Sequence, residues 1–119
     1  MPKKQRLGSA DFKIIAAARF RREHGALFTL SHGTLLGQKE IVPKVACIVS
    51  KKVSTKAVDR NRIKRRCYAA VREGIKNIAK PVALIFYAKR SAKDASYADI
   101  RKDITALMEG MHRSFLAKS

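Results

Sequence analysis

The sequence predicts an α+β fold, a small α/β sandwich in which helices pack on a sheet of about four strands. Segments with a helical hydrophobic period alternate with short β-branched segments, in the order α-β-β-α-β-α. The chain has 119 residues, which suits one domain, and we expect residues 1–119 to form it. Its 46% hydrophobic residues are enough for one compact core, which lacks tryptophan and should be mostly aliphatic.

The amino-terminal part predicts a tail and a helix. Residues 1–8 are basic, and we expect them to form a short flexible tail. Behind them, Ser9 is a suitable N-cap, and apolar side chains that include Phe12 and Phe20 follow helical spacing. We therefore expect a first helix from residue 10 to about residue 22.

Two strands should follow this helix. Residues 26–31 mix aromatic, β-branched and aliphatic side chains and predict a strand. Residues 32–43 contain two glycines and a proline, so we expect a long turn there, with room for an extra strand or hairpin. Residues 44–50 are apolar and β-branched, which favours a central strand.

The second helix is the most basic segment of the chain. Ten of the 27 Lys and Arg residues lie between Lys51 and Lys76, against two acids, Asp59 and Glu73. A helical apolar row runs through the same segment and includes Ile63 and Cys67. We expect this helix to be capped by Ser54 or Thr55, and to run to about residue 79, before a proline.

The last part of the chain predicts a strand, a turn and a helix. Residues 82–88 form a continuous apolar run, which is typical of a strand covered on both faces. Residues 89–95 form a basic turn. Ser96 and Asp99 then have the spacing of a capping box, and apolar residues from Tyr97 to Met111 predict an amphipathic last helix.

The net charge of +18 indicates a polyanionic partner, of which nucleic acid is the commonest. Solubility alone does not require so much charge of one sign. Cys47 and Cys67 form no metal-binding or disulfide pattern, so we expect buried free thiols in a reducing cytoplasm. The basic start has no hydrophobic region behind it and no apolar run is long enough to span a membrane, so we expect a cytoplasmic protein without a membrane partner.

Helical geometry separates the two sides of the basic helix. With the apolar row against the sheet, Asn61, Arg65, Tyr68 and Arg72 form an outer stripe, and Arg62 and Arg66 lie on the other flank. Guanidinium groups suit phosphate oxygens, Asn61 can read a base edge or a 2′-hydroxyl, and Tyr68 can stack on a base. These observations predict a structured nucleic-acid-binding domain, and they do not separate DNA from RNA.

The segment SKKVSTKAVDRNRIKR at residues 50–65 resembles the signature of the bacterial ribonuclease P protein component. Asp11 and Phe12 in the first helix, the apolar strand at 82–88, the basic turn and the capped last helix are similar to that family as well. The resemblance implies a left-handed β-α-β crossover, whereas the general rule favours the right-handed one.

The resemblance also implies a function. The chain would be the protein subunit of an endoribonuclease that removes the 5′ leader from precursor tRNA. A catalytic RNA would carry the active site and hold Mg²⁺, with one protein per RNA and no catalytic or metal-binding residue in the chain. The predicted RNA-binding residues, from the motif and the helix geometry together, are Lys51, Lys52, Lys56, Arg60, Asn61, Arg62, Lys64, Arg65, Arg66, Tyr68 and Arg72.

A second set would contact the single-stranded leader, in a cleft between the first helix and the sheet. Phe12 matches an aromatic residue of the family that stacks on leader bases, and Phe20 could supply a second ring. The alternative is that both rings pack in the core. Lys89 stands where the family usually has arginine, and Arg90 follows it. Two other functions remain open: a basic RNA- or DNA-binding protein such as a ribosomal protein, and a nuclease that acts without RNA. The scattered histidines and the lack of clustered acids argue against the nuclease.

Overall fold

The structure, a computed structural model, describes residues 21–34, 43–76, 78 and 82–117. The predicted tail and the predicted first helix up to residue 20, with Phe12 and Phe20, lie outside these residues. No helix in the described ranges is long and apolar enough to cross a membrane.

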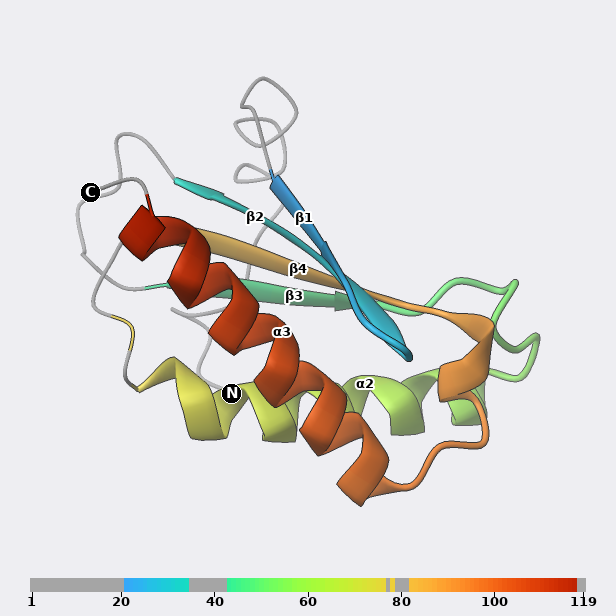
Figure 1. Ribbon diagram of the computed structural model, residues 1–119. Coiled ribbons are helices and arrows are strands. Elements are labelled where there is room, and N and C mark those ends of the chain that lie inside the picture. The colour runs from blue at the N-terminus through green and yellow to red at the C-terminus, as the bar shows by residue number, and fades with distance from the viewer. Residues whose placement is uncertain (1–20, 35–42, 77, 79–81, 118–119) are drawn as a thin grey trace.

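Four strands form one mixed sheet (Figure 1). Their order across the sheet is β1-β2-β4-β3. Strand β2 is antiparallel to both of its neighbours, whereas β3 and β4 run parallel. The strands are β1 (Arg21–His24), β2 (Phe28–Thr34), β3 (Lys44–Ile48) and β4 (Val82–Ala88).

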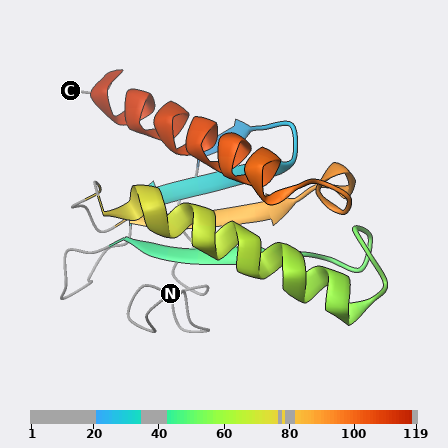
Figure 2. The ribbon, with the colours of Figure 1, turned by 90° about the horizontal axis from the view of Figure 1, so that it is seen from below.

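Helices α2 (Ala57–Ile75) and α3 (Tyr97–Ala117) cover the same face of the sheet (Figures 1 and 2). A short 3₁₀ helix, η2 (Arg90–Ala92), lies between β4 and α3. Helix α2 connects the parallel strands β3 and β4. Seen from the helix side in Figure 2, with both strands running to the right, β4 lies above β3 behind α2, so the crossover is left-handed. The predicted α+β sandwich is confirmed, and so is the rare crossover that the family resemblance implies.

Three predictions about the strands are wrong, and they concern β1, the end of β2, and the place of β3 in the sheet. Arg21 and Arg22, expected at the end of a helix, belong to β1, which pairs with β2 from Arg21↔His32 to His24↔Thr29. This strand is polar because it lies at the sheet edge, where most of its side chains are exposed. Strand β2 extends to Thr34, into the predicted turn, because its backbone pairs with β4 as far as Val82.

The predicted central strand, β3, is also an edge strand. It is nevertheless apolar, since Val45 and Cys47 are buried under the helices. Its backbone is protected at Cys47, whose N–H donates a hydrogen bond to the Tyr68 hydroxyl of α2 at 3.1 Å. The helix thus satisfies one backbone N–H of this edge strand.

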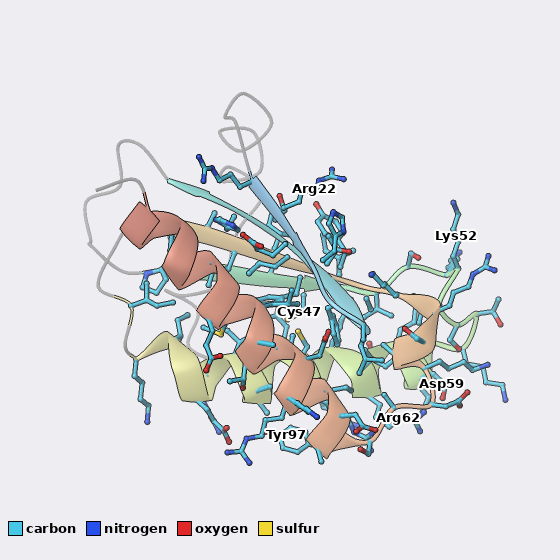
Figure 3. The ribbon with its side chains drawn as sticks, in the orientation of Figure 1. Arg22, Cys47, Lys52, Asp59, Arg62 and Tyr97 are labelled. Atoms are coloured by element: carbon cyan, nitrogen blue, oxygen red, sulfur yellow. The ribbon has the colours of Figure 1, made fainter. Side chains whose placement is uncertain are left out.

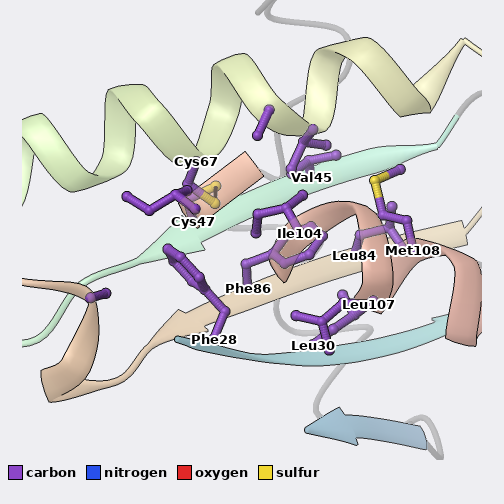
Figure 4. Packing of buried hydrophobic residues seen from close by; sticks show 14 of the residues in the cluster. Phe28, Leu30, Val45, Cys47, Cys67, Leu84, Phe86, Ile104, Leu107 and Met108 are labelled. Carbon is purple, nitrogen blue, oxygen red and sulfur yellow. Dashed lines mark hydrogen bonds between the residues drawn. The ribbon is translucent and has the colours of Figure 1, made fainter. Parts of the chain in front are cut away.

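The hydrophobic core lies between the helices and the sheet (Figure 4). Leu30, Phe86 and Cys47 are buried and come from three adjacent strands, in register across the same face. Ala83 and Ile85 point to the opposite face and are also buried, so the predicted coverage of β4 on both faces is confirmed. Both helices bury an apolar row: Ile63, Cys67, Ala70, Val71 and Ile75 in α2, and Ile100, Ile104, Leu107, Met108 and Met111 in α3. The predicted row of α2 is confirmed from Ile63 to Val71, whereas Gly74 and Ile78, expected to continue it, are only partly buried and Ile75 is buried instead.

A single carboxylate of α3 holds the turn between β1 and β2. Asp103 accepts hydrogen bonds from three consecutive backbone N–H groups, at 2.9 Å from Ala26, 3.1 Å from Leu27 and 2.9 Å from Phe28. A Cβ on Gly25 would lie 2.6 Å from the Asp103 Oδ1, so a larger residue at this position would displace the carboxylate. On the carbonyl side of the turn, Ser91 Oγ donates to the Ala26 oxygen at 2.8 Å.

The two cysteines meet in the core. Cys47 of β3 and Cys67 of α2 are free thiols, with their sulfur atoms 2.7 Å apart (Figure 4). The residues are 5% and 0% exposed, respectively. The predicted buried free thiols are therefore confirmed, and they join the edge strand to the basic helix.

We expect Asp103→Asn to destabilise the protein by about 2 kcal/mol, because an amide nitrogen cannot accept the N–H bonds that a carboxylate oxygen accepts. Thermal unfolding should show a melting temperature lower by roughly 5–10 °C. Glu109→Gln is the matched control, since Glu109 is an exposed acid of the same helix. Equal melting temperatures for both variants would contradict the assigned role of Asp103.

We also expect neither thiol of the native protein to react with an aromatic disulfide reagent within minutes, because reaction requires an exposed thiolate. In guanidinium chloride both cysteines of the chain should react at once. Absorbance of the released thiol measures this directly. Rapid modification under native conditions would show that Cys47 and Cys67 are not packed as described.

Candidate nucleic-acid interface

Helix α2 divides into a buried row and an exposed basic side. The buried row packs on the sheet and on α3, which fixes the rotation of the helix. The predicted RNA-binding residues lie on the remaining surface or in the loop before the helix. None of them is buried.

The loop before α2 is held by the first turn of the helix. Arg60 Nη1 donates hydrogen bonds to two backbone carbonyls of this loop, at 3.0 Å to Ser54 and 2.9 Å to Thr55. The Ser54 hydroxyl donates to Asp59 Oδ2 at 2.9 Å and accepts from the Lys56 N–H at 3.3 Å. Lys56 is the N-cap and makes no side-chain cap, so the predicted cap by Ser54 or Thr55 is wrong. The helix also ends at Ile75, earlier than predicted.

Three other predicted RNA-binding residues have partners within the protein. Arg62 Nη2 lies 3.2 Å from Asp59 Oδ1, and the Arg62 side chain remains 39% exposed. Arg66 Nη1 donates to the Ala95 carbonyl at 3.1 Å and so ties α2 to the segment before α3. The Tyr68 hydroxyl is held by the edge strand, as described above. These side chains help to build the surface on which the other basic groups lie.

The rest of the predicted RNA-binding set has no such partner. Within the described ranges, these side chains make no hydrogen bond or ion pair, and their groups are available to a ligand. Lys52 and Arg62 lie at the end of the molecule where α2 begins, together with Asp59 (Figure 3). The residues of this set are Lys51, Lys52, Lys56, Asn61, Lys64, Arg65 and Arg72.

An open depression of about 540 Å³ lies on the exposed side of α2, lined by Val58, Asn61, Lys64, Arg65 and Tyr68. Four of these were predicted to bind RNA. The fifth, Val58, is 74% exposed and was missed. A signal was present in the sequence, since Val58, Asn61 and Arg65 follow the i, i+3, i+7 spacing of one helix face.

The predicted leader-binding residues are only partly described. Lys89 Nζ donates a hydrogen bond to the Gly25 carbonyl at 2.6 Å, so its charge is engaged at the β1–β2 turn. Arg90 is exposed at the start of η2. The turn with Lys89 and Arg90 and the loop with Lys51 and Lys52 before α2 are distant in sequence, but they lie at the same end of the molecule (Figures 1 and 2).

Comparison with known proteins gives consistent results. The Ribonuclease P family model matches residues 1–112. The ribonuclease P protein component of Clostridioides difficile (strain 630) is 37% identical over 90 residues, which are 73% of this chain and 78% of the relative. That of Microcystis aeruginosa (strain NIES-843 / IAM M-2473) is 32% identical over 104 residues, 82% of each chain.

The fold agrees with a solved structure. The Staphylococcus aureus RNase P protein superposes with a TM-score of 0.72 at 22% identity, covering 88% of this chain and 93% of the other. The family match extends over most of the sequence and includes the basic helix and the sheet. The chain therefore belongs to the ribonuclease P protein component family.

Proposed function

We propose that this chain docks on the catalytic RNA of ribonuclease P through the exposed side of α2, and that it contacts the 5′ leader of precursor tRNA elsewhere. Its family is that of the protein components of this endoribonuclease, in which the RNA holds the catalytic role. The observation that carries the docking proposal is the group of unpartnered basic side chains on a helix whose other side is buried.

The chemistry of this side suits RNA. Ammonium and guanidinium groups bind phosphate, and releasing condensed counterions from RNA makes such binding favourable at low salt. Several like charges one turn apart repel one another in the free protein. Phosphates placed between them remove this repulsion, so the same arrangement that costs helix stability favours the complex.

The basic residues of α2 divide into two groups in this proposal. Lys64 and Arg65, with the lysines of the preceding loop, contact RNA directly. Arg60 holds the loop before α2, and Arg66 holds the segment before α3, since their donors are bonded to backbone carbonyls there; both position that surface. Arg62 does both, because its ion pair with Asp59 leaves part of the guanidinium exposed.

We further propose that Phe12, Phe20, Lys89 and Arg90 contact the leader. Of the two described residues, Arg90 has the more available charge, because Lys89 is bonded to Gly25. In this proposal the RNA holds the Mg²⁺ ions, one protein binds one RNA, and the complex acts in the cytoplasm.

A reconstitution assay tests the proposed function. The purified protein, added to the ribonuclease P RNA of the same organism at low magnesium, should increase the rate of 5′ cleavage of precursor tRNA. Protein without RNA should give no correct cleavage. The absence of stimulation would overturn the proposal and favour another basic RNA-binding protein, whereas correct cleavage by protein alone would place the active site in the chain.

Two arginines of one helix should behave differently. We expect Arg65→Ala to weaken binding to the ribonuclease P RNA about threefold to tenfold and to reduce the salt slope by about 1, because a phosphate contact is lost. Its melting temperature should not change. Arg60→Ala should lower the melting temperature by roughly 5 °C, because two carbonyl bonds of the loop are lost.

Filter binding at several salt concentrations and thermal unfolding measure the two effects. Thr105→Ala, on the exposed side of α3, is the control for both. If Arg65→Ala unfolded more easily than Arg60→Ala, the assignment of the two groups would be wrong.

A further inference from the structure

We propose that the depression beside Val58 is a binding site for one unpaired nucleotide of the RNA subunit, with its base against Val58, a phosphate at Lys64 and Arg65, and Tyr68 as the wall at the far end. The inference rests on the proposed function, since it names the part of the RNA that this surface takes. It concerns a site within the docking helix and not the helix as a whole.

The exposure of Val58 is the first observation. Its side chain is 74% exposed, and Val58 and Tyr87 are the only exposed large hydrophobic residues among those whose side chains the structure describes. Packing does not require valine at this position. Helix formation does not favour it either, because a β-branched residue has a lower helix propensity than alanine or lysine. Contact with an apolar surface, such as the face of a base, would remove this area from water.

The second observation is that the neighbouring aromatic ring is fixed. Tyr68 accepts the hydrogen bond of the Cys47 N–H through its hydroxyl, and its ring packs against the core while it also lines the depression. A ring held at both points loses little conformational entropy when a nucleotide contacts it. Tyr68 therefore supplies a rigid wall at the end of the depression away from Val58, about 15 Å along the helix.

The polar groups around these two side chains match a nucleotide. Asn61 makes no side-chain hydrogen bond in the described part of the chain, and its amide offers both donors and an acceptor to a base edge. Lys64 and Arg65 carry positive charge and are likewise unpartnered there. The nearest acid on the helix, Asp59, is already bonded to Ser54 and Arg62. The depression is thus positive, and it favours a phosphate beside the base.

An unpaired nucleotide fits this site better than a duplex. In an A-form helix the major groove is too deep and narrow for side chains to read, whereas unpaired bases can be turned outward and contacted on their faces and edges. The depression is open, and it is lined by residues of three consecutive helical turns. Its volume of about 540 Å³ is in the range of small-ligand sites and is enough for one nucleotide.

The test begins with the RNA. Chemical probing of the ribonuclease P RNA with and without wild-type protein should reveal an unpaired nucleotide that is protected by the wild type and not by Val58→Ala. The same variant should bind the RNA about tenfold more weakly, a loss within the range known for base contacts with protein side chains. Its salt slope should equal that of the wild type, because no phosphate contact is removed.

A double-mutant cycle then links the residue to the nucleotide. Removing the base of the protected nucleotide should weaken wild-type binding about as much as Val58→Ala does. Combining both changes should give no further loss. Thr105→Ala, which truncates an exposed β-branched residue of α3, should leave affinity and protection unchanged.

The outcomes separate this inference from the function on which it rests. If the wild-type protein does not bind the RNA, the proposed function fails. If the wild type binds and Val58→Ala binds equally well with the same protection, the nucleotide site is refuted while the function stands. Losses that add fully in the cycle, or protection confined to paired segments, would also refute it.

Discussion

The apolar row of α2 fixes the rotation of this helix, and the arrangement of the basic surface depends on it. Ile63, Cys67 and Val71 are at most 1% exposed, packed among the sheet and α3. Because an α-helix has 3.6 residues per turn, burial of this row turns the stripe of Val58, Asn61 and Arg65 toward solvent. Exposing the row instead would cost about 1.5–3 kcal/mol for each large side chain.

Basic residues of the same helix serve two purposes. A guanidinium group has several donors in a fixed plane, so it can satisfy backbone carbonyls as well as phosphates. Arg60 and Arg66 use their donors on two loops, and Asp59 lies between the positive groups as the local acceptor. These contacts give a strongly basic helix a defined start. They also explain why the basic residues of one continuous motif are not all equally available to a ligand: some of them are already bonded within the protein.

Much of the fold could be predicted, and the errors share a cause. Both helical apolar rows and the strand at 82–88 follow from local periodicity, and the structure confirms them. Strand β1 was missed because its four polar residues carry no strand pattern and pair only through the backbone. Strand β3 was placed centrally because its side chains are apolar, but the order of strands is not a local property. Val58 was missed because exposure, and not residue type, distinguishes it.

The sequence by itself determined the fold class, the basic face of α2 and the family. Charge, hydrophobic period and motif are local properties, so they can be recognised without coordinates. Only the tertiary structure decided which basic groups are bonded within the protein and which are left without such a partner. That choice depends on hydrogen-bond partners from distant segments, such as the Ala95 carbonyl, 29 residues from Arg66. It also decided that the Tyr68 hydroxyl of α2 holds the backbone of the edge strand at Cys47. Such contacts arise when elements pack together, and no period along the chain encodes them.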